Sequence, residues 1–286
     1  MNIALEDFKK FYRFFERKER FLVLEILSDF SRATLFKANF YRKRIDLIKS
    51  VFCKVDNNDI NNTLTELAKL LKKVRSGSHC KVIISLDPSL ATTIHSSVVL
   101  ARDKPKNEID DSDLNNRIAQ GIWRLFDRQR GKAATKMKVT DLDVTLADVK
   151  VKSVKLDGNK VVNPLGFSAK TIEIQFSQTF NPKFFLEKLK TIIPKHDSVA
   201  FLESGSADAE IAAKAAALTN FLMLRVFENR ADIFLVDGAT IINLDSCAWG
   251  RHTLIASLGA AFAISSAVAE RILGAYLIRQ GSPAML

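Results

Sequence analysis

The sequence has few of the residues that bind metals or form disulfides. Its 286 residues include only three cysteines and four histidines. Cys53, Cys80 and Cys247 lie far apart and form no Cys-x-x-Cys pair, and the histidines follow no His-Glu-x-x-His spacing. We therefore expect no disulfide framework and no metal site, and free thiols of this kind suit a reducing cytosol.

Long apolar runs are also scarce, and the first residues lack the apolar core of a signal peptide. Residues 1–19 are charged throughout and place apolar side chains at helical spacing, which predicts an amphipathic N-terminal helix. That helix either packs on the rest of the chain or lies on a membrane surface. Residues 253–269 are the most apolar stretch, but they are slightly short for the ~20 residues of a membrane span. We expect two short buried helices there, separated near Ser265.

The net charge of the chain is strongly positive, at +11. A basic surface can attract nucleic acid or anionic lipid. No helix-turn-helix, zinc finger or aromatic RNA-binding motif accompanies the charge. We therefore expect solvated basic faces and no nucleic-acid partner.

Apolar patterns in the first third predict a sheet covered by helices. Strand-like runs occupy residues 21–26, 32–38, 44–52 and 81–87, with an amphipathic helix over 60–74 between the last two. This β-β-β-α-β order is typical of an α/β fold.

The next block predicts a small α+β insert. A helix over residues 110–131 is expected to end at Gly131. Two alternating runs then meet at Asp157-Gly158, which is a strong hairpin signal. Residues 168–180 alternate as a half-buried strand. The side chains expected to point inward from this strand are Ile172, Ile174 and Phe176.

The chain then repeats its opening pattern. FLVLEILSDFSRATLF (21–36) is echoed by NFLMLRVFENRADIFLV (220–236), each of them a strand, a turn and a second strand. A third strand follows a turn at Asp237-Gly238, and two helices run to about Arg279. Two β-β-β-α halves with an inserted small domain are therefore predicted.

This arrangement resembles the actin/Hsp70/sugar-kinase superfamily and, within it, the bacterial cell-division protein FtsA. The most specific match is VVNPLGFSAKTIEIQF (161–176), which resembles the Asn-Pro-Leu-Gly motif and following strand of the inserted 1C subdomain, of SHS2 type. The resemblance spans roughly residues 20 to 283 and implies an actin-like (ribonuclease H-like) α/β lobe, an α+β insert and the start of a second lobe. The implied parts are the N-terminal helix (1–19), subdomain 1A (20–91), the insert (92–180), the return to 1A (181–217) and a partial subdomain 2A (218–286).

The resemblance implies a nucleotide cleft bounded by two phosphate loops. The family's first loop reads Asp-x-Gly-Ser/Thr, and the matching positions here hold Glu25, Leu27 and Ser28. Glycine lets the backbone approach a phosphate, whereas leucine puts a bulky side chain there. The longer Glu25 side chain also misplaces a metal-bound water ligand by roughly 1 Å.

The second loop is altered as well. The family reads Asp-x-Gly-Gly-x-x-Thr-Asp, whereas the matching positions here hold Arg225, Phe227 and Glu228, and only the last acid is kept. We predict no catalytic residue, no ATP hydrolysis and no micromolar ATP affinity, with ATP and Mg²⁺ as cofactors only if these loops still bind. The implied remnant of the nucleotide site consists of Glu25, Ser28 and Asp232.

The resemblance implies a cell-division adaptor that acts by protein–protein contact, in the cytoplasm at the membrane face of the division site. In that family the 1C region contacts other subunits and recruits later division proteins. The predicted interaction surface is therefore the motif itself, Asn163, Pro164, Leu165, Gly166 and Phe167. Alternatively, this turn only fixes the strand register and Phe167 lies in the core.

Two other functions stay open. A PilM-like pilus-assembly actin homologue shares an inserted domain and binds a short peptide of a membrane protein, and an actin-like ATPase would bind and hydrolyse ATP. FtsA also continues into a 2B subdomain that contacts FtsZ and into a membrane helix, whereas this sequence ends at Leu286 before either. Contact with FtsZ is therefore left open, membrane contact is expected to be peripheral at most, and an unpaired surface is expected to favour self-association.

Overall fold

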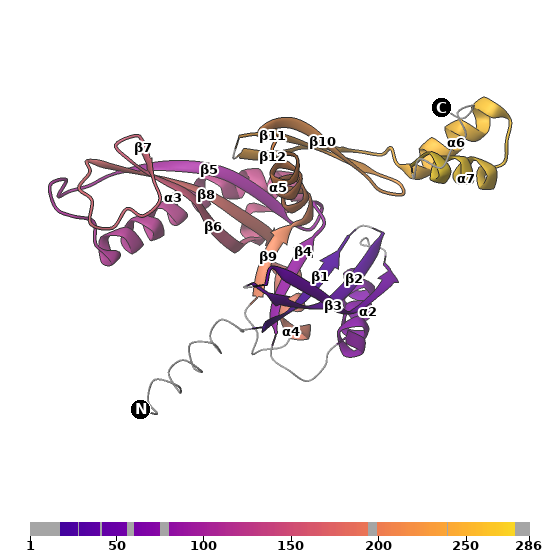
Figure 1. Ribbon diagram of the computed structural model, residues 1–286, viewed down its shortest axis with the longest axis horizontal. Helices are drawn as coiled ribbons and strands as arrows, with labels where there is room; N and C mark the ends of the chain where they lie inside the picture. The colour runs from indigo at the N-terminus through magenta and orange to yellow at the C-terminus, as the bar shows by residue number, and fades with distance from the viewer. Residues whose placement is uncertain are drawn as a thin grey trace.

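The computed structural model describes most of the chain. The residues described are 18–27, 29–40, 42–55, 60–74, 80–193, 199–238 and 240–277. The expected N-terminal helix lies outside them except for Lys18 and Glu19, which begin the first strand, and Ser28 also lies outside them. The described strands form sheets of five, four and three strands (Figure 1).

The five-stranded sheet has the strand order of an actin-like lobe. Its strands are β1 (Lys18–Ile26), β2 (Phe30–Asn39), β3 (Arg44–Lys54), β4 (Lys81–Leu86) and β9 (Val199–Glu203). They lie in the order β3-β2-β1-β4-β9, antiparallel from β3 to β1 and parallel from β1 to β9. This order, with crossovers between the parallel strands, confirms the predicted fold class. Helices α2 (Ile60–Val74) and α4 (Lys183–Ile192) supply leucines and a phenylalanine to its core.

The insert is a four-stranded antiparallel sheet with one long helix. Its elements are β5 (Thr92–Ala101), α3 (Asp111–Met137), the short 3₁₀ helix η1 (Asp141–Asp143), β6 (Val144–Leu156), β7 (Asn159–Val161) and β8 (Thr171–Pro182). The strand order is β5-β8-β6-β7. The inward set predicted for β8 is confirmed, because Ile172, Ile174 and Phe176 are fully buried.

The predicted end of α3 at Gly131 is wrong. The helix continues to Met137 and ends where Lys138 takes a left-handed conformation, with φ of 55°. Ala133, Ala134 and Met137 pack against Phe180 of β8, so burial of the last turns outweighs the weak helix propensity of a single glycine.

Helix α5 (Ser204–Ala216) connects the first lobe to the three-stranded sheet of the second. Its strands are β10 (Asn220–Val226), β11 (Ala231–Asp237) and β12 (Thr240–Cys247), in that order and antiparallel. One face of the sheet packs on α5, with Phe234 fully buried. The close approach of α5 depends on Gly205, because a Cβ there would lie 1.9 Å from Cζ of Phe234.

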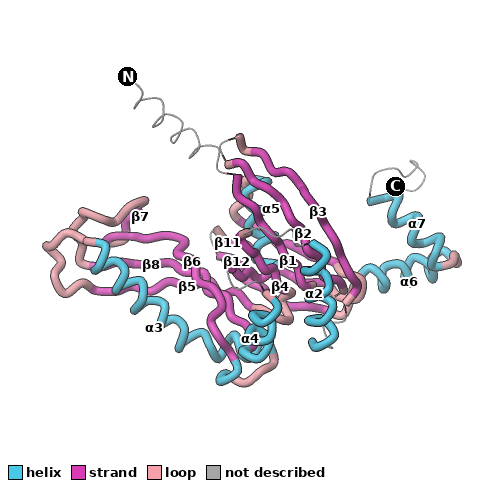
Figure 2. The backbone as a smooth tube through the Cα atoms, turned by 90° about the horizontal axis from the view of Figure 1, so that it is seen from below, coloured by secondary structure: helices cyan, strands magenta, loops and turns pink. Residues whose placement is uncertain are grey.

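Two helices, α6 (Arg251–Phe262) and α7 (Ser266–Leu277), follow the second sheet. The expected break near Ser265 is confirmed, but the expected burial is wrong, since Ile255 and Ala269 are their only buried residues. Figures 1 and 2 show the pair standing off the end of the sheet. Among the described helices none alone has the length and hydropathy of a membrane span; α6 and α7 pass that test only as a pair, bent by 110° at their junction.

Candidate functional site

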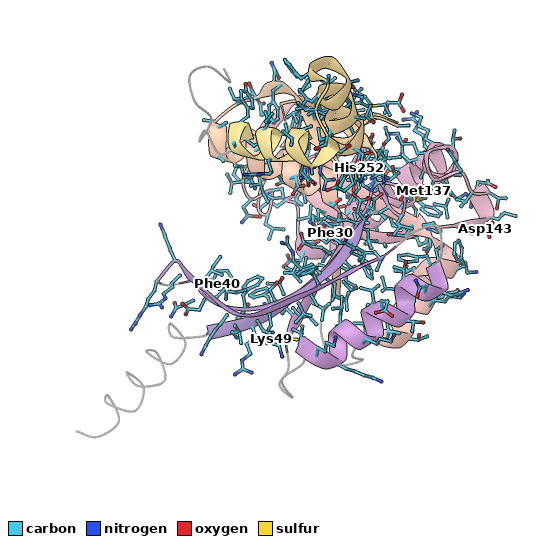
Figure 3. The ribbon with its side chains drawn as sticks, turned by 90° about the vertical axis from the view of Figure 1, so that its right-hand side faces the viewer. Phe30, Phe40, Lys49, Met137, Asp143 and His252 are labelled. Atoms are coloured by element: carbon cyan, nitrogen blue, oxygen red, sulfur yellow. The ribbon has the colours of Figure 1, made fainter. Side chains whose placement is uncertain are left out.

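The turns implied as phosphate loops, β1–β2 and β10–β11, lie against each other. The backbone N–H of Glu228 in the second turn donates to Oδ2 of Asp29 in the first, at 3.1 Å. In Figure 3, Phe30 marks this end of β2, close to His252 at the start of α6, whereas Phe40 lies at the far tip of the β2–β3 ribbon. The structure therefore brings together the two turns that the resemblance implied as phosphate loops.

Arg230 bridges the two halves at this junction. Its Nη2 donates to Oδ2 of Asp87, at 2.7 Å, and to Oδ2 of Asp232, at 3.2 Å. Its Nε lies 2.9 Å from the other oxygen of Asp232. Asp87 follows β4 in the first lobe, Asp232 lies on β11 in the second, and both side chains are fully buried. We call this arrangement the Arg230 bridge.

The two carboxylates have further partners. Oδ1 of Asp87 accepts hydrogen bonds from the backbone N–H and the hydroxyl of Ser89, at 2.9 and 2.7 Å. Oδ1 of Asp232 accepts from the hydroxyl of Ser246, at 2.7 Å. Burial lowers the pKa of Arg230, but the hydrogen bond that it donates to Asp87 and the charges of both aspartates outweigh this effect and raise the pKa overall. The guanidinium is therefore charged and held by both lobes.

Backbone donors at the two turns are already bonded within the chain. The N–H of Leu27 donates to the carbonyl of Phe30, at 3.0 Å, and the N–H of Phe227 to the carbonyl of Arg230, at 2.7 Å. A phosphate bound at these turns would need the same backbone N–H groups, those of Leu27, Phe227 and Glu228, as hydrogen-bond donors. The residues present therefore do not fit a Mg²⁺-nucleotide, which would have to displace both the Arg230 bridge and these turn hydrogen bonds.

The implied remnant of the nucleotide site is scattered. Glu25 lies on β1 opposite Arg32 of β2 and forms an ion pair with it, and Asp232 belongs to the Arg230 bridge. Ser28 lies outside the described residues. Arg225, which stands where the family has an acid, turns to α5 and donates to the hydroxyl of Ser204 at 2.9 Å. Of the two remnant residues that the structure describes, Asp232 lies at the junction and Glu25 does not.

Sequence reasoning missed Asp87 and Arg230. Asp87 directly follows a buried parallel strand, and the carboxyl ends of such strands are where α/β sheets place polar sites. Arg230 lies two residues before Asp232, a spacing that puts both side chains on the same face of an extended chain. These two signals can be read from the sequence. The sequence does not indicate, however, that Asp87 and Arg230 are in contact, because they lie 143 positions apart.

A surface cleft of about 520 Å³ lies beside the Arg230 bridge. Lys136 of α3 crosses it and donates to the carbonyl of Asn243 on β12, which ties the insert to the second lobe. Burial lowers the pKa of Lys136, and the negative charges of Glu203 and Asp245 offset part of this shift. Among the described residues, no group of three or more His, Cys, Asp and Glu side chains is placed to hold a metal ion.

The Asn-Pro-Leu-Gly loop joins β7 to β8 and is held rigidly. The N–H of Ile109 donates to the carbonyl of Phe167, and the N–H of Gly166 donates to the carbonyl of Ile109, both at 2.9 Å. Gly166 has φ of +80°, which explains a glycine there. Phe167 is 55% exposed, so it is not part of the core.

The five residues of this loop divide into two groups. Asn163, Gly166 and Phe167 are exposed, whereas Pro164 is buried and Leu165 packs against the core of the insert. Oδ1 of Asn163 accepts from the N–H of Leu165, at 3.1 Å, and so closes the turn. Only three of the five motif residues therefore contribute to the surface that the loop offers to a partner.

Glu203 is a buried acid at the junction of β9, α5 and the insert. Its carboxylate accepts hydrogen bonds from the hydroxyl of Ser206, at 2.6 Å, and from the N–H of Thr93, at 3.2 Å. The second oxygen has no hydrogen-bond partner among the described residues. Burial raises the pKa of Glu203 to about 7, despite these two hydrogen bonds.

The strand order and the paired half-lobes define an actin-like α/β protein with an inserted subdomain. No family model matches the chain, and no curated protein matches its sequence. Among solved structures, the chain is similar to the PilM–PilN type IV pilus biogenesis complex, with 12% identity over 89% of this chain and 69% of the other, and a TM-score of 0.47. It is also similar to a protein from Bacteroides thetaiotaomicron with an actin-like ATPase fold and unknown function, with 11% identity over 89% and 80%, and a TM-score of 0.44. The ethanolamine utilization protein EutJ from Carboxydothermus hydrogenoformans is a further similar structure, with 8% identity over 95% and 71%, and a TM-score of 0.35.

Proposed function

We propose that the protein is a non-catalytic, FtsA-like adaptor of the cell-division machinery that acts through protein–protein contact at the cytoplasmic face of the division site. The observation that carries this proposal is the Arg230 bridge. A protein side chain takes the place between the lobes where an actin-like ATPase holds its nucleotide.

The charges at the junction support a pseudo-ATPase. Phosphoryl transfer depends on a metal ion and on donors that stabilise the charge of the transferring group. Here two buried carboxylates, Asp87 and Asp232, face an arginine of their own chain, and the backbone donors of the turns are bonded internally. A metal would meet a fixed positive charge, which opposes its binding.

The insert supports the adaptor role. Its Asn-Pro-Leu-Gly loop presents an aromatic side chain, Phe167, on a backbone fixed by hydrogen bonds to Ile109. A rigid, exposed aromatic residue is the kind of anchor that dominates protein–protein interfaces, because little conformational entropy is lost when it is buried. The proposed partners are other cell-division proteins.

Calorimetric titration with Mg-ATP tests the nucleotide part of the proposal. We expect no binding heat up to millimolar ATP and no release of phosphate. Dissociation constants in the micromolar range would contradict a closed site and favour an actin-like ATPase.

Localisation and interaction assays in a bacterial host test the adaptor part. We expect the fluorescently tagged chain to gather at the division site, and Phe167→Ala to lose its partners there. Phe184→Ala is the matched control, because Phe184 is 44% exposed on α4, outside the insert. Capture of a short peptide of a pilus membrane protein, with no division-site signal, would instead support a PilM-like role.

A further inference from the structure

The face of the β10–β12 sheet turned away from α5 is apolar and exposed. The strand register places Leu222 of β10, Leu235 of β11 and Ile242 of β12 in one row across the sheet. We call this the outer face, and its aliphatic side chains are Leu222, Leu224, Val226, Ile233, Leu235 and Ile242. A contiguous apolar surface of this kind marks an interaction site.

The first half of the chain shows what normally covers such a face. FLVLEI of β1 and FLMLRV of β10 match position by position, so that Leu22, Leu24 and Ile26 correspond to Leu222, Leu224 and Val226. The β1 residues are buried under α2, with exposures of 2%, 0% and 0%. The β10 residues have exposures of 66%, 55% and 47%. The same strand pattern is therefore buried in one half and bare in the other.

The helix that should cover the outer face is directed elsewhere. In the first half, α2 follows β3 and packs back on the sheet; in the second, α6 follows β12 but packs chiefly on α7. Figures 1 and 2 show α6 and α7 extending beyond the end of the sheet. We call this helix pair the arm.

Hydrogen bonds and an ion pair hold the start of α6 so that the helix points away from the outer face. The N–H groups of Arg251 and His252 donate to the carbonyls of Phe227 and Glu228, at 2.8 and 2.9 Å. The Arg251 guanidinium also pairs with the Glu228 carboxylate at 3.1 Å. Gly250 is needed for the contact, since a Cβ there would lie 2.6 Å from both carbonyl oxygens. The arm cannot turn back over its own sheet without breaking these contacts.

The arm is itself apolar and incompletely packed. Phe262 and Leu277 are each 68% exposed, and Tyr276 is 54% exposed. The chain therefore carries two apolar surfaces, the arm and the outer face, and its own geometry keeps them apart. Burial of a leucine or phenylalanine side chain stabilises by about 1.5–3 kcal/mol, so both surfaces favour a partner.

We propose that the arm of one copy packs on the outer face of a second copy, and that the exchange is reciprocal. A two-fold axis generates both contacts from one, so that each copy buries its arm and its outer face together. A stable dimer buries about 800 Å² on each partner, which is the area that the two helix-on-sheet contacts have to supply together. This inference is independent of the proposed adaptor function, because it uses no residue of the Arg230 bridge or of the insert.

Light scattering of the full chain after gel filtration tests the proposal. We expect a particle of twice the 32.0 kDa chain mass at micromolar concentration. Leu224→Lys places a charge in the outer face and is expected to weaken dimerisation about tenfold or more. Leu47→Lys is the matched control, because Leu47 is 67% exposed on β3 and should leave the dimer intact. A wild-type chain that stays monomeric, or an L224K chain that dimerises as wild type does, would overturn the proposal.

A cysteine pair distinguishes exchange between copies from packing within one copy. Leu224→Cys and Val268→Cys are made on separate chains in a Cys247→Ser background, which removes the exposed native thiol. We expect oxidation of the mixture to give a disulfide-linked dimer that neither variant gives alone. A double variant that forms the disulfide within a single chain, with no dimer, would show that the arm folds back and would refute the exchange.

Discussion

Arg230 and Asp87 approach to 2.7 Å although 143 positions separate them, and their contact joins the second lobe to the buried end of a strand in the first. The aspartate has no exposed side-chain surface. Such a pair keeps its geometry because separating the partners would leave a buried charge without its counter-charge, which is energetically unfavourable.

Arg230→Met should destabilise the protein strongly. The change leaves Asp87 and Asp232 buried without their cation, and removal of one member of a buried pair costs about 3–5 kcal/mol. Urea unfolding followed by circular dichroism measures the loss. Arg44→Ala is the control: its ion pair with Asp46 is exposed, so a change of at most about 1 kcal/mol is expected. Equal effects of the two substitutions would contradict a structural role for the bridge.

Gly205→Ala should destabilise the second lobe. A Cβ at this position would overlap the ring of Phe234, which is fully buried and has no room to retreat. Overpacking of this kind costs about 1–3 kcal/mol. Gly131→Ala is the matched control, because it lies inside α3 and no atom outside the adjoining part of that helix lies within 4 Å of its added Cβ. That control should be neutral or stabilising by up to about 1 kcal/mol, as thermal unfolding would show.

Glu203 should make stability fall as pH rises. Its folded pKa of about 7 lies above the ordinary value of 4.5, so the folded state holds the proton more tightly than the unfolded state. The resulting stabilisation is complete below pH 4.5 and is lost as pH rises through 7. In Glu203→Gln, the change in unfolding free energy between pH 5 and pH 8 should differ from wild type by on the order of 2–3 kcal/mol. Denaturant titrations at both pH values measure it, and an unchanged pH slope would count against the assignment.

His95 should act with the opposite sign. Burial, with a smaller contribution from the charge of Lys152, lowers its pKa to about 4, so its contribution to stability is present above pH 6.5 and is lost as pH falls through 4. His95→Gln should therefore flatten the acid side of the stability profile and leave the neutral side unchanged. Loss of slope near pH 7 instead would assign the neutral transition to His95 and not to Glu203.

Phe167→Ala should leave stability within about 0.5 kcal/mol of wild type, because the ring lies at the surface. Pro164→Ala, in contrast, changes a buried residue of the same loop and should lower stability. Thermal unfolding of the two variants separates the exposed part of the loop from its supporting part. A large loss of stability in F167A would mean that the ring serves the fold.

Local pattern in the sequence predicted the sheets well. Alternation along Ile172, Ile174 and Phe176 reflects burial that repeats with the strand period. The echo between β1 and β10 predicted a strand in each half, although the matching β10 residues are exposed. The pattern could not predict contacts between residues that lie far apart in the sequence. The Arg230 bridge joins side chains from different lobes, and the direction of α6 depends on carbonyls of another turn. The extension of α3 past Gly131 likewise came from packing on Phe180, which local propensity does not include.

The Arg230 bridge affects how assemblies of this protein would be regulated. An actin-like protein that closes on ATP changes shape with the energy supply of the cell, and its assemblies can be dismantled by hydrolysis. In the proposed pseudo-ATPase, a cleft held closed by Asp87, Arg230 and Asp232 would lack this nucleotide-dependent change. Assemblies built from this chain would be regulated by how much of it is made and how soon it is degraded.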